Sequence, residues 1–303
     1  MEESPRLSVV IASYFARATI GRCLASLERQ DTVDPFEVIV VESSGDGTVE
    51  DVRRDFPWVR VLAVEDRQYA GDARNLAISQ AHAGLIAFLD ADCTVDSDWV
   101  SAVLVAHRSS HLVVGGVIDN ARRDSLLSWG YYFCEFNLWL PGRGPREIDE
   151  IAGCCLSMKR EAYDRYGPFL PGTYSSDTAF QWRLTADGHR VLRRPEIRVF
   201  HDGAMGFASF LGHILQHRKD FARVRSAEKG LSRFARLASA AASIALPPVL
   251  FLVIGARVVR SGSYVPQFIA SMPVVVVGLA ARCAGEFLGY LESARRPKRN
   301  AAP

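Results

Sequence analysis

The stretch that decides the fold is an apolar run ending in two carboxylates, Leu85-Ile86-Ala87-Phe88-Leu89-Asp90-Ala91-Asp92. Such a short apolar run is typical of a strand that is buried on both faces of a sheet. Because successive strand residues alternate faces, Asp90 and Asp92 project to the same side. Two carboxylates placed in this way repel each other unless a cation lies beside them, and a hard divalent ion that also binds phosphate suits the position. The structural alternative is a capping Asp followed by a turn Asp.

Further β-rich runs lie on both sides of this stretch and alternate with helical patterns. The predicted strands are Leu7–Ser13, Phe36–Glu42, Val59–Val64, Leu85–Leu89, Leu112–Val117, Ile151–Met158 and Arg190–Phe200. The early helical segments are Thr19–Arg29, Thr48–Phe56 and Ala70–Ala81. This order predicts an α/β fold with a mostly parallel, twisted sheet flanked by helices, and ligands in such folds bind beyond the carboxyl ends of strands. The chain has no G-x-G-x-x-G after its first strand and no Gly-Lys-Ser/Thr loop, so dinucleotide-binding and P-loop interpretations are excluded.

The formal net charge of +2 combines two unlike parts of the 303-residue chain. Residues 231–303 hold nine Lys/Arg and two acidic residues, whereas residues 1–230 hold 27 basic and 32 acidic residues. An acidic body with a basic, apolar tail is not typical of a nucleic-acid-binding protein. It indicates an enzyme fixed to a membrane.

Two long uncharged stretches in the tail predict a membrane anchor. Leu237–Ala256 and Tyr264–Ala281 hold 20 and 18 uncharged residues, and about 20 helical residues cross the hydrocarbon core. We therefore expect two transmembrane helices within residues 233–292, followed by a basic tail at 293–303. The positive-inside rule places both termini and the body in the cytoplasm, at the inner membrane. The alternative is a buried helical hairpin.

Two further segments admit two interpretations each. Residues 204–232 contain Phe207, Phe210, Leu211, Ile214 and Leu215 at helical spacing, which predicts an amphipathic helix that either lies in the membrane interface or packs on the body. The aromatic segment 129–140 predicts either an acceptor platform near the bilayer or a buried connector.

The six cysteines show no metal-binding or disulfide spacing and are expected to be buried thiols. No signal peptide is expected at the start of the chain.

The ordered set of motifs resembles family-2 glycosyltransferases of the GT-A fold over residues 6–202, a domain that we expect at 1–203. The resemblance is carried by Val9-Val10-Ile11-Ala12-Ser13-Tyr14, Val38-Ile39-Val40-Val41-Glu42-Ser43-Ser44 with Asp46-Gly47-Thr48, Gly71 with Ala73-Arg74-Asn75, Phe88-Leu89-Asp90-Ala91-Asp92, Gly153-Cys154-Cys155, Gly167-Pro168-Phe169, Asp177, Arg183-Leu184 and His201.

The resemblance implies a role for each matching residue. Asp177 would be the catalytic base, although its usual acidic neighbour is replaced by Ser176, and Asp92 would bind Mg²⁺ or Mn²⁺ with His201 as a further ligand. For Asp177 the structural alternative is a helix cap, and for His201 it is a strand-end hydrogen bond. Glu42 would contact the nucleotide base in a position where Asp is usual. The expected donor-binding set is Ser13, Tyr14, Glu42, Ser44, Gly71, Arg74, Asn75, Asp90 and Arg183.

The function implied is inverting transfer of a sugar from a UDP- or GDP-sugar to a hydroxyl of a lipid-linked or glycan acceptor at the membrane. Cell-envelope polysaccharide or glycolipid synthesis is the expected setting, with no nucleic-acid partner. Two alternatives stay open. One is a polyprenyl-phosphate glycosyltransferase, which would need Asp177 little because its acceptor is already ionised, and the other is a catalytically lapsed scaffold protein.

Overall fold

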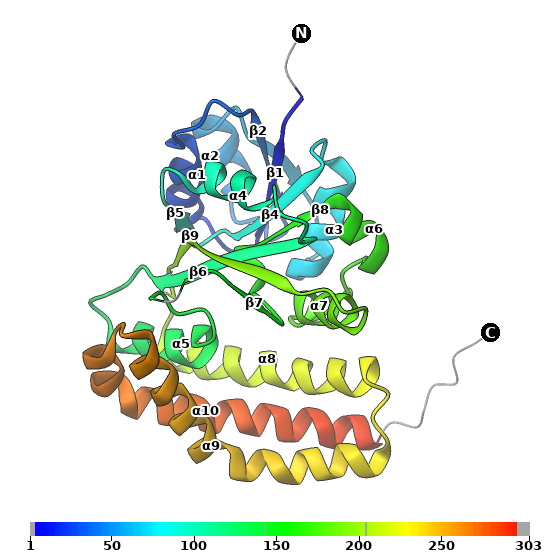
Figure 1. Ribbon diagram of the computed structural model, residues 1–303, viewed down its shortest axis with the longest axis vertical. Coiled ribbons are helices and arrows are strands. Elements are labelled where there is room, and N and C mark those ends of the chain that lie inside the picture. Colours follow the sequence, from blue (N-terminus) through cyan, green and yellow to red (C-terminus); the bar gives the residue numbers. More distant parts are fainter. Residues whose placement is uncertain (1–3, 143, 204, 296–303) are drawn as a thin grey trace, which may run out of the picture. The chain divides into compact units, whose positions relative to one another are not determined.

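The computed structural model describes residues 4–142, 144–203 and 205–295, and the last part of the predicted basic tail, residues 296–303, lies outside this range (Figure 1). The chain divides into two compact units. The first comprises Met1–Arg122 and Leu138–Gly203, and the second comprises Arg123–Asn137 and Ala204–Pro303.

The first unit is built on a nine-stranded mixed sheet of order β3-β2-β1-β4-β8-β6-β9-β5, with β7 paired to β9. The strands are β1 (Leu7–Ser13), β2 (Phe36–Glu42), β3 (Arg60–Ala63), β4 (Leu85–Asp90), β5 (Cys93–Val95), β6 (Val113–Asn120), β7 (Arg146–Ile148), β8 (Leu156–Lys159) and β9 (Val191–His201). Its helices are α1 (Ile20–Glu28), α2 (Thr48–Asp55), α3 (Ala70–Gln80), α4 (Trp99–Ala106), α6 (Arg160–Tyr166) and α7 (Ser176–Ala186), with a 3₁₀ turn η1 (Gly153–Cys155). The predicted α/β fold is confirmed.

The sheet is mixed, with parallel pairs at β1–β2, β2–β3, β1–β4 and β6–β9. Strands β1 to β4 pair in parallel, but β8 pairs antiparallel with both β4 and β6. The predicted strand Ile151–Met158 is shortened because its first part forms the η1 turn, in which Cys155 N–H donates to the Ala152 carbonyl. Only Leu156–Lys159 is left to enter the sheet as β8.

The central strands bring polar residues to one edge because their registers agree. In β1 the residues Leu7, Val9, Val10 and Ile11 are fully buried, as expected for a strand covered on both faces. Ser13 lies opposite Glu42 on β2, and Ala12 lies opposite Asp90 on β4. The carboxyl ends of three adjacent strands therefore meet at the edge where ligands of α/β proteins bind.

A glycine bulge in β6 sets the end of β9. The register between β6 and β9 shifts between Gly115 and Val117, and a Cβ atom on Gly116 would lie 1.7 Å from the Ile197 carbonyl oxygen. After this bulge β9 continues to His201, which lies opposite Cys93 of β5. The absence of a side chain at Gly116 thus allows His201 to reach Asp92 and Cys93.

The second unit consists of α5 (Leu126–Phe136), α8 (Phe207–Glu228), α9 (Arg233–Ser261) and α10 (Val265–Arg295). The last three are long helices that lie side by side, with α10 packed against both α8 and α9 (Figure 1). Helices α9 and α10 are long and apolar enough to cross a membrane. Helix α9 extends beyond the predicted stretch 237–256 at both ends, and α10 extends beyond 264–281 at its C-terminal end.

The aromatic segment is a buried connector and not an exposed platform. Trp129, Tyr132 and Phe133 of α5 are at most 2% exposed. Their rings contact Tyr264 and Phe268, which belong to the same helical unit. Their apolar area is used in packing, so the acceptor-platform interpretation is not supported.

We expect Gly116→Ala to destabilise the protein because its methyl group would overlap backbone that cannot move independently. Overpacking costs about 1–3 kcal/mol in typical cores, so the thermal unfolding midpoint should fall by several degrees. The matched control is Gly84→Ala, where an added Cβ meets nothing within 4 Å. Equal unfolding temperatures for the two variants would contradict the steric role of Gly116.

Candidate functional site

The first part of the site lies at the end of β4, where Asp90 pairs with Arg74 of α3. Arg74 is 4% exposed, and its Nη2 atom lies 3.2 Å from Asp90 Oδ1. Its guanidinium also lies over the Phe88 ring, 5.1 Å from the centroid. Among the described residues, Arg74 Nε has no hydrogen-bond partner. A buried cation with an unused N–H group can bind an anionic ligand.

Gly153 connects this cation to the predicted base. Its backbone N–H donates to Asp177 Oδ2 at 2.8 Å, while Asp177 Oδ1 accepts from the Thr178 N–H at 2.9 Å. A Cβ atom on Gly153 would lie 2.4 Å from Arg74 Nη1. The glycine therefore lets the Arg74 guanidinium approach and fixes the Asp177 carboxylate at the start of α7.

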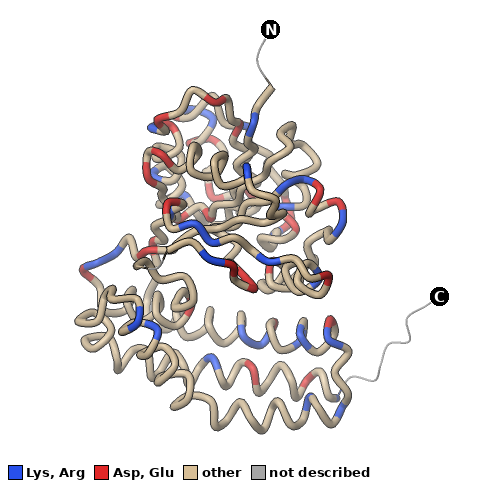
Figure 2. The backbone as a smooth tube through the Cα atoms, in the orientation of Figure 1, with Lys and Arg blue, Asp and Glu red and all other residues tan. Residues whose placement is uncertain are grey.

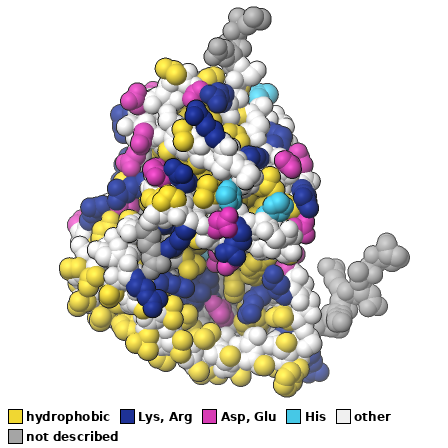
Figure 3. Space-filling view, in the orientation of Figure 1, with side chains coloured by type: hydrophobic (Ala, Val, Ile, Leu, Met, Phe, Trp, Pro, Cys, Tyr) yellow, Lys and Arg dark blue, Asp and Glu magenta, His cyan; other side chains and the backbone are white. Residues whose placement is uncertain are grey.

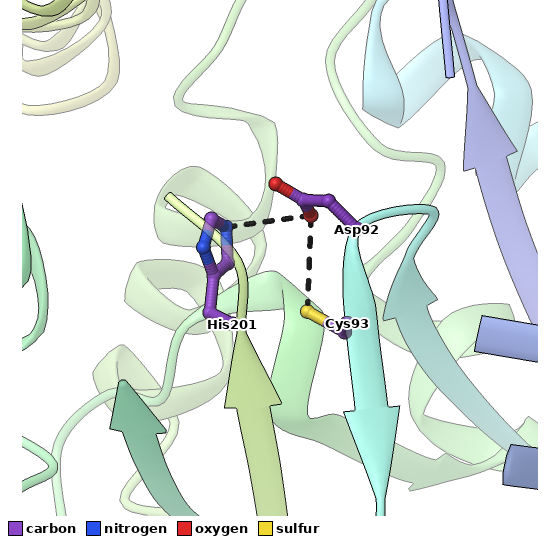
Figure 4. Close-up of side chains that lie close together, drawn as sticks. All are labelled: Asp92, Cys93 and His201. Atoms are coloured by element: carbon purple, nitrogen blue, oxygen red, sulfur yellow. Dashed lines mark hydrogen bonds and ion pairs between the residues drawn. The ribbon is translucent and has the colours of Figure 1, made fainter. Parts of the chain in front are cut away.

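A candidate metal cluster lies where β5 meets the end of β9. Asp92, Cys93 and His201 each offer one ligand atom, and these atoms lie within 4.8 Å of one another (Figure 4). Asp92 Oδ1 lies 3.5 Å from His201 Nε2 and 3.9 Å from Cys93 Sγ. Burial raises the pKa of Asp92, and His201 opposes that rise.

The donor set of this cluster fits a divalent ion. A carboxylate oxygen and an imidazole nitrogen suit Mn²⁺ as well as harder or softer divalent ions. Burial raises the pKa of the Cys93 thiol well above its usual value, so the sulfur keeps its proton when no metal displaces it. Asp92 and His201 would hold the ion, as the sequence predicted. Cys93 was missed, although its position directly after Asp92 could have indicated it.

The nucleotide-binding residues expected at the ends of β1 and β2 form a buried hydrogen-bonded group. Glu42 is 1% exposed, and its carboxylate accepts hydrogen bonds from the Ser13 hydroxyl and from the Ser44 N–H and hydroxyl. Tyr14, by contrast, is 40% exposed. Glu42 thus orients Ser13 and Ser44 at the site edge, and the prediction that it contacts the base itself stays a prediction.

Three other predicted donor-binding residues make contacts that hold loops. The Asn75 amide bonds both the N–H and the carbonyl of Phe169, and Arg183 Nη1 donates to the carbonyls of Tyr166 and Pro168. A Cβ atom on Gly71 would lie 2.6 Å from Ser176 Oγ, so this glycine lets α3 approach α7. These contacts stabilise the loops around the site, and the prediction that the three residues bind the donor stays a prediction.

Arg67 lies beside Tyr14 and also contacts Tyr69 and Tyr174. The motif pattern did not indicate these three residues. The Arg67 guanidinium lies 4.7 Å from the Tyr14 ring centroid and 5.1 Å from that of Tyr69. Arg67 Nη2 also donates to the Tyr174 hydroxyl at 3.0 Å. No spacing rule could have found this group, because it joins two loops that are distant in sequence.

The family profile described as "Glycosyl transferase family 2" matches residues 8–167 of this chain. The chain belongs to this family. It is 33% identical over 187 residues to the uncharacterized glycosyltransferase YfnE of Bacillus subtilis (strain 168), covering 58% of this chain and 44% of that protein. It is 37% identical over 108 residues to the validoxylamine A glucosyltransferase of Streptomyces hygroscopicus subsp. jinggangensis (strain 5008), covering 34% of this chain and 26% of that protein. The chain thus spans less than half the length of these relatives.

Solved structures show the same GT-A fold. The mannosyltransferase PcManGT from Pyrobaculum calidifontis, in complex with GDP-Man and Mn²⁺, aligns with a TM-score of 0.58 and 19% identity, covering 97% of this chain and 86% of that one. TarS of S. aureus in complex with UDP-GlcNAc aligns with a TM-score of 0.54 and 15% identity, covering 93% and 90% of the two chains. At these identities the likeness concerns the fold alone.

We expect Gly153→Ala to weaken binding of UDP or GDP by about tenfold, which equals the loss of one charge-assisted contact of about 1.4 kcal/mol. The added methyl group displaces the Arg74 guanidinium, which is the flexible end of a side chain, so the unfolding temperature should change little. Calorimetric titration measures the affinity. Gly144→Ala, where an added Cβ meets nothing within 4 Å, is the matched control. Unchanged nucleotide affinity in Gly153→Ala would contradict the role assigned to Arg74.

Proposed function

We propose that this member of glycosyltransferase family 2 is an inverting enzyme that transfers a sugar from a UDP- or GDP-sugar to a hydroxyl of a membrane-associated acceptor. The observation that carries the proposal is the orientation of Asp177. Two backbone N–H groups, from Gly153 and Thr178, bind its two carboxylate oxygens. This geometry fixes the carboxylate in one orientation, as a general base requires, and such positioning contributes directly to rate.

The transfer would proceed by one displacement. Asp177 accepts the proton of the acceptor hydroxyl while that oxygen attacks the anomeric carbon. The bond from the anomeric carbon to the diphosphate oxygen breaks as the new glycosidic bond forms, which inverts the anomeric centre. Arg74 stabilises the anionic diphosphate, and Asp90 fixes the guanidinium through the ion pair at 3.2 Å.

Asp92 and His201 would hold Mg²⁺ or Mn²⁺, and the Cys93 sulfur lies within 4.8 Å of their ligand atoms. When bound, the ion would supply positive charge against the diphosphate. Ser13 and Tyr14, with Ser44 oriented by Glu42, would line the nucleoside pocket. PcManGT binds GDP-Man with Mn²⁺, and TarS binds UDP-GlcNAc, so both bases stay within the proposal.

We further propose that the second unit binds the protein to the inner membrane with the first unit in the cytoplasm. Helices α9 and α10 carry highly exposed apolar side chains, including Phe234 at 82%, Leu252 at 71% and Ile244 at 69%. An exposed apolar surface of this length is unusual for a protein that stays in water. An acceptor in cell-envelope polysaccharide or glycolipid synthesis would be within reach of a membrane-bound enzyme.

We expect Asp177→Asn to lower kcat by about 100- to 10,000-fold, the usual contribution of a general base, with donor affinity changed little. The amide oxygen can still accept one backbone hydrogen bond, so the fold is preserved. The assay measures release of nucleoside diphosphate by detergent-solubilised protein with Mn²⁺, a donor panel and membrane lipid extract.

The control for this assay is Asp149→Asn, which removes a carboxylate that is 73% exposed and forms an ion pair with Arg190. Full turnover in Asp177→Asn would contradict the hydroxyl-acceptor mechanism and would favour an acceptor that is already an ionised phosphate.

We expect the full chain to stay in the membrane pellet after alkaline extraction, and Ile244→Lys combined with Leu252→Lys to release it. Each lysine would bring a charge into the apolar surface that the membrane covers, and a lysine at the bilayer centre costs about 2.5–3.5 kcal/mol on insertion scales. Val33→Lys, at a fully exposed position of the first unit, is the control and should remain in the pellet. Release of the wild-type chain would contradict membrane association.

A further inference from the structure

The orientation of the apolar α9–α10 hairpin in the membrane is limited by contacts within each unit and by the length of the chain that joins the units. The sequence predicts two spans with the α9–α10 turn on the side opposite the first unit. Within the helical unit, however, Arg257, next to that turn, donates from Nη1 to Asn137 Oδ1. The Arg123 guanidinium lies 5.8 Å from the Tyr264 ring centroid, also at the turn. Both ends of the α5 segment therefore lie at the turn end of the hairpin.

The chain beyond α5 is too short to cross a membrane. Trp139, only two residues after Asn137, belongs to the first unit, where its carbonyl accepts a hydrogen bond from the Ile118 N–H at 3.0 Å. Two extended residues reach about 7 Å, against about 30 Å for the hydrocarbon core. The α9–α10 turn and the first unit must therefore be on the same side of the membrane.

A second spanning arrangement would keep the turn on the side of the first unit and place the other ends of α9 and α10 on the far side. Helix α8 is packed against α10, so it would have to cross the membrane as well. The ideal Cβ positions of Gly278, Gly285 and Gly289 lie 2.7 Å from the Phe210 ring, 2.3 Å from the Leu215 carbonyl and 2.3 Å from the Lys219 carbonyl. The charged residues of α8 in this region are Arg218, Lys219, Asp220, Arg223 and Arg225. A helix with this many charges does not enter hydrocarbon.

The remaining arrangement agrees with the distribution of side chains. The exposed apolar residues Leu237, Ile244, Leu252 and Val259 extend along the length of α9. The tube of α9 carries charges only near its two ends, whereas α8 and α10 carry charges along their adjoining parts (Figure 2). Apolar side chains gather on the visible face of α9 and the adjoining part of α10 (Figure 3). A helix about 10–12 Å wide fits within one leaflet, whose hydrocarbon is about 15 Å thick.

We propose that α9 and α10 lie parallel to the membrane within one leaflet and do not cross it. The occupant of their exposed face is the acyl-chain region of that leaflet, and Arg233, Arg236, Arg257 and Arg260 lie at its headgroups. The turn, both helix ends and the first unit are then all on the cytoplasmic side. This inference rests on the membrane association proposed above and not on the transfer chemistry, so it can be tested without a donor or an acceptor.

The test places one cysteine in the turn, by Ser263→Cys, and labels spheroplasts with a membrane-impermeant maleimide. The six native cysteines are buried, which keeps the background low. The control is Val33→Cys, at a fully exposed position of the first unit. We expect both variants to be labelled only after the membrane is permeabilised. Labelling of Ser263→Cys in intact spheroplasts would overturn the proposal in favour of two spans.

A depth measurement tests the same point without depending on the turn. Nitroxide labels at Leu237→Cys, Ile244→Cys and Leu252→Cys should report equal depths if α9 lies in the plane of the membrane. A spanning helix would place position 244 about 10 Å deeper than position 237, since seven residues rise about 1.5 Å each, and that result would overturn the proposal. Failure of the wild-type chain to sediment with membranes would contradict the membrane association itself, which the alkaline extraction measures separately.

Discussion

The register of three adjacent parallel strands is the constraint on which the rest of the site depends. Ser13 pairs with Glu42 and Ala12 pairs with Asp90, so the ends of β1, β2 and β4 coincide. A slip of one residue would turn every side chain of a strand to the opposite face. Near-complete burial of these strands on both faces makes such a slip costly, and the polar residues that follow them are therefore held at one edge. The site can then be rigid, because most of its residues lie at strand ends or in helices.

The charged groups Arg74 and Asp177 at this edge are bonded in ways that leave part of each group available. Arg74 is nearly inaccessible, yet only one of its guanidinium nitrogens is committed to Asp90 in an ion pair, and the described part of the chain offers Nε no partner. Asp177 accepts backbone hydrogen bonds on both oxygens, but a carboxylate can accept about four. Placing charged groups in this way is unfavourable for folding, since burial without full compensation costs free energy. The same arrangement suits catalysis, because oriented groups need no reorganisation when charge develops.

The sequence predicts the elements of the first unit well and their contacts poorly. Strands β1 and β2 match their predicted bounds because continuous apolar runs with polar ends have one stable solution, burial in a sheet centre. The short β5 could not be predicted from periodicity, since three residues show none, yet it places Cys93 opposite His201. The motifs place Asn75 and Arg183 at the donor, and both also bond the loop at 166–169, so their donor role stays a prediction. The spacing of motifs in the sequence identifies residues near a site. Tertiary contacts are needed to tell which of them face a ligand and which of them stabilise the surrounding loops.

The helical unit shows why apolar length alone does not determine topology. Helix α10 has enough apolar residues to cross a bilayer, but its glycines at 278, 285 and 289 bring it against the charged helix α8. Glu135 of α5 is bonded by His217 and Arg218 of α8. Burial alone would raise the pKa of Glu135, yet Arg218 and His217 hold it well below its ordinary value, so the carboxylate stays ionised. A buried ionic group of this kind is strongly destabilised if one member is removed. It therefore fixes α5 to α8, and both helices pack against α10 together with α9. The apolar side chains that stay exposed, such as those of α9, are the ones that the proposed in-plane position would give to lipid.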